Sequence, residues 1–204
     1  MGMSSLVLAA DTLLGTPTTG SYEYDGAAMY ATTTTSQRGI ISTDQLAIQQ
    51  ATYTLTSQTA AQKLFNVLAS GQVTLTAGTY SFECFFSLSS MSATSGSFGF
   101  ALGGTATFTQ YWWADAQKGT ATVATATATQ STYNTAAANT ALATASVNTV
   151  GYAKIGGTIV VSSGGTVIPQ VSLGVAAAAV VGIGSYFRIR PVGSTSVVSV
   201  GNWS

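Results

Sequence analysis

The chain has 204 residues, of which 46% are hydrophobic and only 6% are charged, whereas about 25% of the residues of an ordinary soluble domain are charged. Six basic residues balance six acidic ones, so the chain lacks the basic surface that phosphate binding requires, and no nucleic-acid partner is expected. There is no histidine, and Cys84 is the single cysteine. This excludes Ser-His-Asp and Cys-His catalysis, His-based metal sites and an intrachain disulfide. We expect no catalytic residue, cofactor or metal.

Two apolar stretches are candidates for a targeting or membrane segment. No Lys or Arg precedes the short apolar run that begins at Leu6, although a secretory signal normally has one. The stretch from Leu173 to Ile183 contains two glycines and is too short to span a bilayer. We expect neither a secretory signal nor membrane insertion.

Residues 1–50 have the pattern of short strands and turns. Residues 13–20 combine Pro17 with glycines, and both residue types favour turns over central strands. Asp25 and Gly26 lie between two segments of alternating aromatics and predict a hairpin with a type I′ turn, which needs positive φ at both central positions. This region is too small to form a hydrophobic core by itself. We therefore expect a short, extended attachment or shaft-like segment that packs on copies of itself.

Residues 51–69 are ambiguous. Their later part has apolar residues at helical spacing, with Ser57 as a candidate cap. Residues 52–56 alternate like a strand, and strand is the favoured interpretation throughout. The choice between helix and strand over residues 57–69 stays open.

From Gly71 onward the two-residue period of a strand is strong. One face of the predicted strand that follows the Ala77-Gly78 turn carries Tyr80, Phe82, Cys84, Phe86 and Leu88. The residues between them are mostly polar, which is typical of a half-buried strand. Further strands are predicted at residues 98–102, 108–113, 154–162, 166–175, 185–192 and 196–200.

Residues 119–149 are rich in Thr and Ala. The alternation changes phase after Val123-Ala124, which indicates a bulge or a turn, and residues 135–145 have a weak helical pattern. The tripeptide Gly-Gly-Thr occurs at 103–105, 156–158 and 164–166, where paired glycines indicate tight turns at strand starts. Many short strands with Gly-rich turns predict an all-β fold, an antiparallel jelly roll or β-sandwich over residues 51–204.

Several segments carry a family resemblance. Residues 14–26 (LGTPTTGSYEYDG), followed by Tyr30 and Arg38-Gly39, resemble a segment common in bacteriophage tail-fibre and virion proteins. Residues 62–65 (QKLF), 75–82 (LTAGTYSF) and 184–193 (GSYFRIRPVG) are similar to the strands of trimeric jelly rolls such as the C1q and tumour-necrosis-factor domains. The resemblance implies a homotrimer on the virion, in contact with other capsid or tail proteins and without catalytic residues. Here the N-terminal segment opens the chain instead of following a long shaft, which favours a short fibre or a capsid decoration.

The candidate contact residues are aromatic and basic: Tyr111, Trp112, Trp113, Arg188 and Arg190. Neighbouring strand positions face opposite ways, so one tryptophan is expected in the core and the other near the surface or a subunit interface. An exposed tryptophan could stack on a host glycan, but core and trimer interface are the favoured interpretation because aromatics dominate both. Arg188 and Arg190 share a face and could pair with Glu83 or Asp115, or contact a ligand.

Two other candidates have simpler explanations. Glu23 and Asp25 are spaced like a carboxylate pair or cation site, yet turn chemistry explains Asp25-Gly26 more simply. Cys84 falls on an apolar strand face, where a buried, inert thiol is expected.

These features suggest three hypotheses for the function. The leading hypothesis is a non-enzymatic structural or host-attachment protein of a phage particle. The second is a carbohydrate-binding module that uses Trp112 or Trp113 as a platform. The weakest is a glycan depolymerase, since glycosidic cleavage usually needs two carboxylates and the chain has only six acids.

Overall fold

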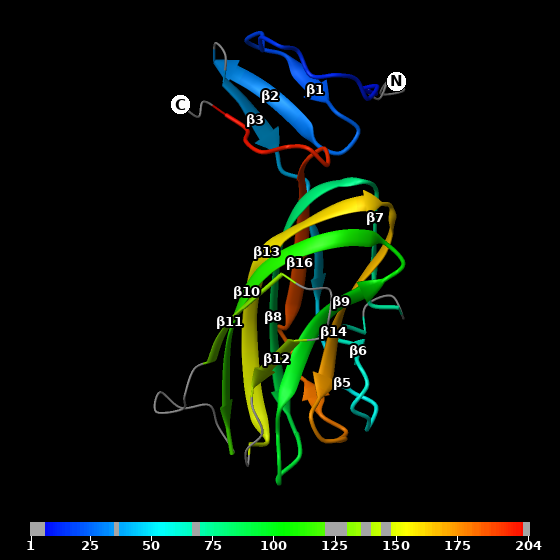
Figure 1. Cartoon of the computed structure of the whole chain (residues 1–204), viewed down its shortest axis with the longest axis vertical. Helices are drawn as coiled ribbons and strands as arrows, with labels where there is room; N and C mark the ends of the chain where they lie inside the picture. The colour runs from blue at the N-terminus through cyan, green and yellow to red at the C-terminus, as the bar shows by residue number, and fades with distance from the viewer. Residues whose placement is uncertain are drawn as a thin grey trace, which may run out of the picture.

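The structure is a computed structural model that describes residues 7–34, 37–66, 70–120, 130–135, 140–143 and 148–201. Within these ranges every regular element is a β-strand, and none is a helix. The strands pair antiparallel and form three sheets: a large sheet, a smaller sheet packed against it, and a collar sheet at one end (Figure 1). The expected all-β antiparallel sandwich is therefore confirmed.

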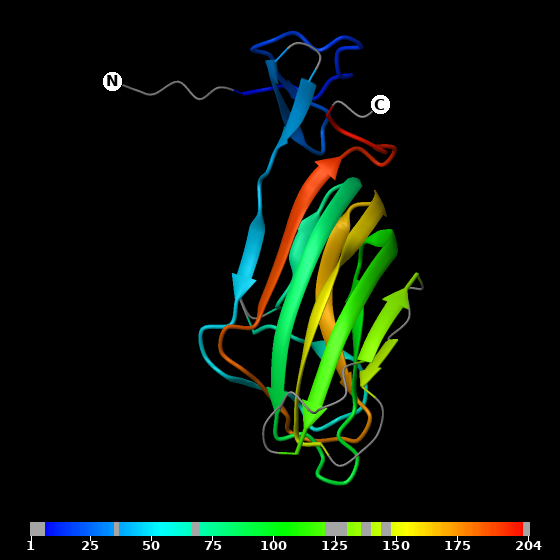
Figure 2. The ribbon, with the colours of Figure 1, turned by 90° about the vertical axis from the view of Figure 1, so that its left-hand side faces the viewer.

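The large sheet has eight strands in the described part of the chain. They are β4 (Gln45–Ile48), β5 (Tyr53–Thr54), β8 (Gly78–Ser89), β10 (Thr107–Gly119), β11 (Gln130–Asn134), β13 (Val150–Ser163), β15 (Val180–Val181) and β16 (Tyr186–Gly193). Their spatial order is β11-β10-β13-β8; β16 and β4 then continue the sheet beside one half of β8, and β15 and β5 beside the other. Figure 2 shows these strands broadside, from β4 at the left to β11 at the right.

The smaller sheet contains β6 (Gln62–Lys63), β7 (Val73–Leu75), β9 (Phe98–Gly104), β12 (Thr140–Ala143) and β14 (Gly165–Leu173). Its order is β12-β9-β14, and both β6 and β7 pair with β14. The chain passes repeatedly from one sheet to the other, for example between β8 and β9, β9 and β10, and β13 and β14. Gly104 shows why glycine makes one of these crossings: its φ is +117°, and a Cβ there would lie 2.1 Å from the Thr166 carbonyl oxygen.

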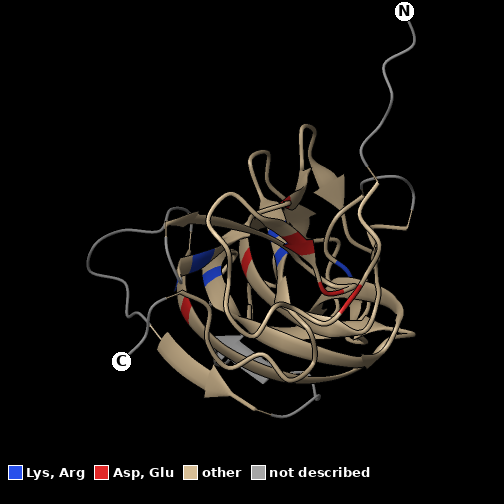
Figure 3. Ribbon diagram, turned by 90° about the horizontal axis from the view of Figure 1, so that it is seen from above, with Lys and Arg blue, Asp and Glu red and all other residues tan. Residues whose placement is uncertain are grey.

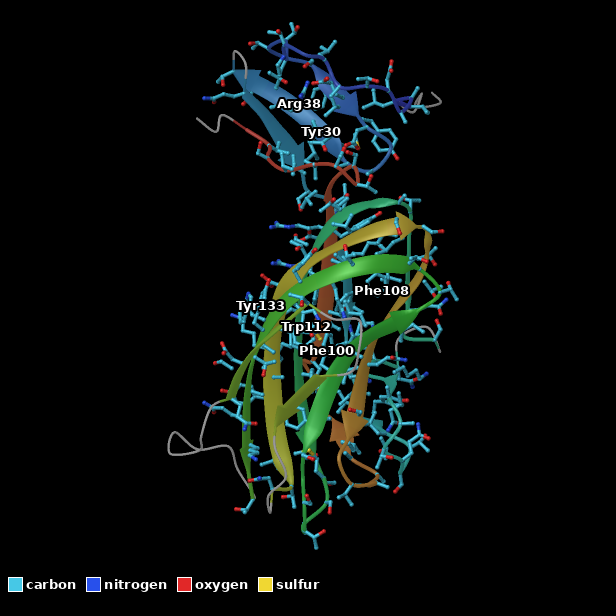
Figure 4. All side chains as sticks on the ribbon, viewed as in Figure 1. Tyr30, Arg38, Phe100, Phe108, Trp112 and Tyr133 are labelled. Atoms are coloured by element: carbon cyan, nitrogen blue, oxygen red, sulfur yellow. The ribbon has the colours of Figure 1, made fainter. Side chains whose placement is uncertain are left out.

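The core lies between the two sheets. The predicted inward face of β8 is confirmed, because each of its five side chains is at most 4% exposed: Tyr80, Phe82, Cys84, Phe86 and Leu88. Aromatic rings join the sheets edge to face, with centroids 5.8 Å apart for Phe86 and Phe98 and 5.5 Å apart for Phe100 and Trp112 (Figure 4). Such pairs contribute about 0.5–1.5 kcal/mol beyond the burial of their area.

Three expectations about elements differ from the structure, and a fourth falls outside the described residues. In the described part of residues 57–69 there is neither a helix nor a long strand, only β6, because Leu64 and Phe65 are buried by packing without regular pairing. Residues 196–200 form no strand. The helix considered for residues 135–145 is wrong at 140–143, where β12 pairs with β9. The expected bulge or turn at Val123-Ala124 lies outside the described residues.

The collar sheet consists of β1 (Tyr22–Tyr24), β2 (Met29–Thr34) and β3 (Gln37–Ile41), and both described ends of the chain lie beside it (Figure 1). The predicted hairpin is present, but its turn is not type I′. The loop has four residues, Asp25 to Ala28, and only Gly26 has a positive φ, +90°. The Asp25 carboxylate supports the loop by accepting the N–H groups of Ala27 and Ala28. β4 falls by number within the expected N-terminal segment, yet it is a strand of the large sheet.

Asp25 also joins the collar sheet to the sandwich. Its Oδ2 accepts the Tyr30 hydroxyl at 2.9 Å and the N–H of Ser194, just beyond β16, at 3.0 Å. The Thr79 hydroxyl, at the start of β8, donates to the Ser194 carbonyl at 2.7 Å. Burial raises the pKa of the Asp25 carboxyl, but its four hydrogen bonds outweigh burial and hold that pKa below its usual value.

Trp112 offers a test of the core. Trp112→Ala should lower the free energy of unfolding by about 3–5 kcal/mol, since it leaves a cavity between the sheets. Trp112→Phe should lower it far less, because the ring volume is largely kept and the indole N–H has no acceptor within the described residues. Chemical denaturation measures both. Equal losses for the two variants would contradict this packing.

Asp25 offers a pH test. A carboxyl with a lowered pKa stabilises the fold above its unfolded pKa of 3.8, and this contribution disappears as the pH falls through the folded pKa. Asp25→Asn should therefore be less stable than the original chain at pH 7, and the difference should shrink below pH 3.8. Unfolding free energies across this range measure it, and a difference that does not vary with pH would refute the role of the charge.

Candidate functional site

The candidate site lies on the outer face of the large sheet, the side that points away from the smaller sheet. Five exposed large apolar side chains lie on it: Leu46, Ile48, Tyr111, Trp113 and Tyr133. Phe85, Tyr152 and Tyr186 are half-buried on the same face, and the Phe85 ring centroid lies 6.1 Å from that of Tyr152 and 6.2 Å from that of Tyr186. Among the described side chains of the smaller sheet's strands, no large apolar group is comparably exposed. The two sides of the sandwich thus differ sharply.

Strand pairing sets these side chains in rows. Directly paired residues of an antiparallel sheet project to the same side, so one row can be followed from strand to strand. It runs from β11 to β4 through Tyr133, Trp113, Gly156, Glu83, Arg188 and Leu46. One edge of the row is aromatic, its middle is charged, and its other edge is aliphatic.

Gly156 explains the position of the Trp113 indole. A Cβ at Gly156 would lie 3.1 Å from Cζ2 of Trp113, so the indole lies over the backbone of β13. Gly157 faces the core instead, where a Cβ would lie 2.5 Å from Cβ of Trp112. These glycines were expected to form a turn at a strand start. They lie in the middle of β13, where Trp112 leaves no room for a side chain at Gly157 and the Trp113 indole crowds a Cβ at Gly156.

A shallow hollow of about 240 Å³ lies beside the indole. Its polar walls are Ser81, Glu83, Lys154, Arg188 and Arg190. Arg188 Nη2 lies 3.0 Å from Glu83 Oε2, and Arg188 Nη1 lies 3.8 Å from Asp44 Oδ2. The Arg190 Nε–H donates to Ser81 Oγ at 2.9 Å. Charges of both signs lie on neighbouring strands here, although the chain as a whole has very few (Figure 3).

The structure brings together four of the five predicted contact residues. Tyr111, Trp113, Arg188 and Arg190 all lie on the outer face. Trp112 is 1% exposed and lies between the sheets, so it contacts the core alone (Figure 4). Arg188 pairs with Glu83, one of the two partners considered for it.

Sequence reasoning missed Lys154, Tyr133 and Leu46. Their places on the outer face depend on the register of strands far apart in the chain, which no local pattern encodes. Tyr133 left one signal, since it is the single aromatic of the Thr/Ala-rich stretch 119–149. In the structure it is 71% exposed at the edge of the large sheet (Figure 4).

The remaining candidates are explained within the fold. Glu23 does not pair with Asp25: it binds Arg38 Nε at 2.9 Å, and this hydrogen bond lowers the pKa of the Glu23 carboxyl. Cys84 is fully buried, and burial raises the pKa of its thiol. Nowhere in the described ranges do three or more His, Cys, Asp or Glu side chains gather as metal ligands would. The same ranges contain no helix with the length and apolar character needed to cross a membrane.

Comparison with known proteins finds no match: no family model fits the chain, and no curated protein or solved structure is significantly similar to it. The resemblance to phage virion proteins and trimeric jelly rolls therefore stands on the quoted residues alone.

Proposed function

We propose that this chain is a non-enzymatic structural component of a bacteriophage particle, which forms a homotrimer on the virion surface as a short tail fibre or capsid decoration and contributes to host attachment. The single observation that supports it best is the outer face of the large sheet. Exposed apolar groups that gather on one face mark an interaction surface more often than single scattered ones do. A face with five exposed large apolar groups and three half-buried rings is typical of a subunit interface.

The charges at the centre of the outer face are partly paired within one chain, which is compatible with assembly. Lys and Glu are depleted at the centres of interfaces because a charge that loses water must be paired. On the outer face, Arg188 already pairs with Glu83 and lies 3.8 Å from Asp44, so part of the charge is compensated within one chain. A second copy could cover this region without burying an isolated ion.

The architecture fits a surface component. The collar sheet lies at one end of the sandwich with both described chain ends, and the sandwich projects away from it (Figure 1). The collar sheet would contact other virion proteins, and the opposite end of the sandwich would be exposed. This arrangement would suit a protein that both attaches to a particle and faces the host.

Size in solution tests the assembly. Light scattering at micromolar concentration should give about three times the 20.6 kDa of one chain. Leu46→Asp, which replaces an exposed apolar group of the outer face with a charged one, should shift the protein towards a monomer with the same circular dichroism. Leu46→Met is the matched control and should keep the assembly. A stable monomer of the original chain would contradict the proposal.

A second candidate function is glycan binding, favoured by the position of Trp113. One side of its indole lies over β13, and its edge borders a hollow with a carboxylate, two guanidinium groups and a hydroxyl. An indole stacks on the apolar side of a sugar ring, while Glu83 and Arg190 could bind its hydroxyl groups. The two functions compete for one surface, because a copy seated on the outer face would cover the hollow.

A glycan array separates these candidates. Glycan binding that is lost on Trp113→Ala, with size and folding unchanged, would favour the carbohydrate module. The homotrimer proposal expects instead that Trp113→Ala weakens assembly and that no glycan binding depends on this residue. Trp113→Phe is the matched control, because it keeps an aromatic ring that could serve either role.

A further inference from the structure

Basic side chains gather at the hollow beside Trp113. The chain has six Lys and Arg residues, and three of them line this one hollow: Lys154, Arg188 and Arg190. Glu83 is the one acid among the described residues of the lining, and it already binds Arg188. With three cations and one acid, the lining has an excess of two positive charges, although the chain as a whole is neutral.

Two of these cations have N–H donors that no described residue accepts. Lys154 Nζ forms neither a hydrogen bond nor an ion pair within the described ranges. Arg190 donates from Nε to Ser81 Oγ, and among the described residues its Nη1 and Nη2 groups have no acceptor. Both side chains are exposed. A ligand could therefore accept hydrogen bonds from both cations without breaking a contact of the fold.

Two further acids lie close to the hollow without lining it. Asp115 is paired with Lys154 in the register of β10 and β13, but its Oδ1 accepts the Ser131 hydroxyl of β11 at 2.6 Å. Asp44 Oδ2 lies 3.8 Å from Arg188 Nη1. In the described part of the chain, neither acid forms an ion pair with the two cations that have unused donors. The charges of these two cations remain available to a ligand.

We propose that this hollow is an oxyanion site, in which Lys154 and Arg190 bind a carboxylate, phosphate or sulfate group. Gly156 places no side chain in the hollow, and the Trp113 indole borders it. Hydrogen bonds from ammonium and guanidinium groups to such anions are about twice as strong as those between neutral groups. The volume of about 240 Å³ is below the roughly 300–1,000 Å³ of pockets for drug-sized ligands, which suits one small charged group.

The oxyanion has two possible sources, a free inorganic ion or the acidic group of a sugar. In an assembly that covers the outer face, an inorganic ion would compensate Lys154 and Arg190, since a charge buried without a partner is costly. In a carbohydrate module, the acidic group would bind the two cations while the sugar ring packs on Trp113. The site thus goes beyond both proposed functions and is compatible with either.

Calorimetric titration of the full chain tests the site. Sodium phosphate and tetragalacturonate are the probes, at pH 7 and constant ionic strength, and at least one should bind saturably. Lys154→Gln and Arg190→Gln should each weaken that binding about tenfold, because each removes a hydrogen bond between charged groups. Lys63→Gln is the matched control: it removes the same charge outside the hollow, where Lys63 binds Asn66, and should leave the affinity unchanged.

Two results of this titration would overturn the inference. The first is that neither probe binds saturably to the original chain. The second is that Lys63→Gln weakens binding as much as the two variants in the hollow, which would mean attraction by net charge without a defined site.

Glu83→Gln gives a test that a loss of folding cannot imitate. It removes the acid of the lining and releases Arg188 from it, so the same probe should bind several-fold more tightly. Asp11→Asn is the matched control, because it changes the net charge equally outside the lining, and it should leave the affinity unchanged. An unchanged affinity in Glu83→Gln would contradict the oxyanion site.

A third comparison separates the two sources. If the ligand is an acidic sugar, tetragalacturonate should bind more tightly than phosphate, and Trp113→Ala should weaken its binding about tenfold. If the ligand is a free ion, phosphate should bind the original chain and Trp113→Ala equally. The methyl ester of tetragalacturonate keeps the sugar rings without their charge and should not bind. Equal binding of ester and acid would overturn the oxyanion site and leave glycan binding standing, while light scattering decides the homotrimer independently.

Discussion

The two-residue period of a β-strand sends alternate side chains to opposite faces of a sheet, and in the large sheet both faces carry large apolar groups. The inward face, which includes Phe86 and Trp112, packs on the smaller sheet and forms the core. The outward face, which includes Trp113 and Tyr133, has no second layer within the described chain. Exposed apolar area of this kind is unfavourable in water, and its removal from water is the favourable term that the proposed assembly would use. The need to cover it connects the fold to the proposed assembly.

Pairing of charges within the chain lowers the usual barrier to such covering. Soluble sheet proteins commonly keep edges and faces apart with Lys and other charged groups. Here only twelve of the 204 residues are charged. Several of them pair within the chain, as Glu23 does with Arg38 and Glu83 with Arg188. The neutral residues Thr and Ser occupy much of the surface. The shape of their side chains favours strands, and their hydroxyl groups favour turns. A surface of this kind stays hydrated without repelling an identical copy.

The strongest strands could be predicted from local pattern alone. The inward face of β8 and the opposite orientations of Trp112 and Trp113 follow from alternation, and the structure agrees. Where pattern and packing disagree, packing prevails: Phe65 is buried in an irregular segment although its neighbours suggest a helix or a strand. The site was harder to predict, since the row from Tyr133 to Leu46 joins six strands whose register depends on long-range pairing. The Gly156-Gly157 pair illustrates this, because its neighbours Trp113 and Trp112 come from a strand about forty residues earlier in the chain.

Radical footprinting of the native protein, with oxidation of each aromatic residue read by mass spectrometry, tests the covered outer face most directly. Tyr22 on the collar sheet serves as the internal reference, because its 61% exposure in a single chain is close to that of Tyr133 and Trp113, 71% and 45%. If a neighbouring copy covers the outer face, Tyr133 and Trp113 should be oxidised much more slowly than Tyr22. Oxidation of all three in proportion to their exposure in the single chain would show that the face is bare, and would contradict the account.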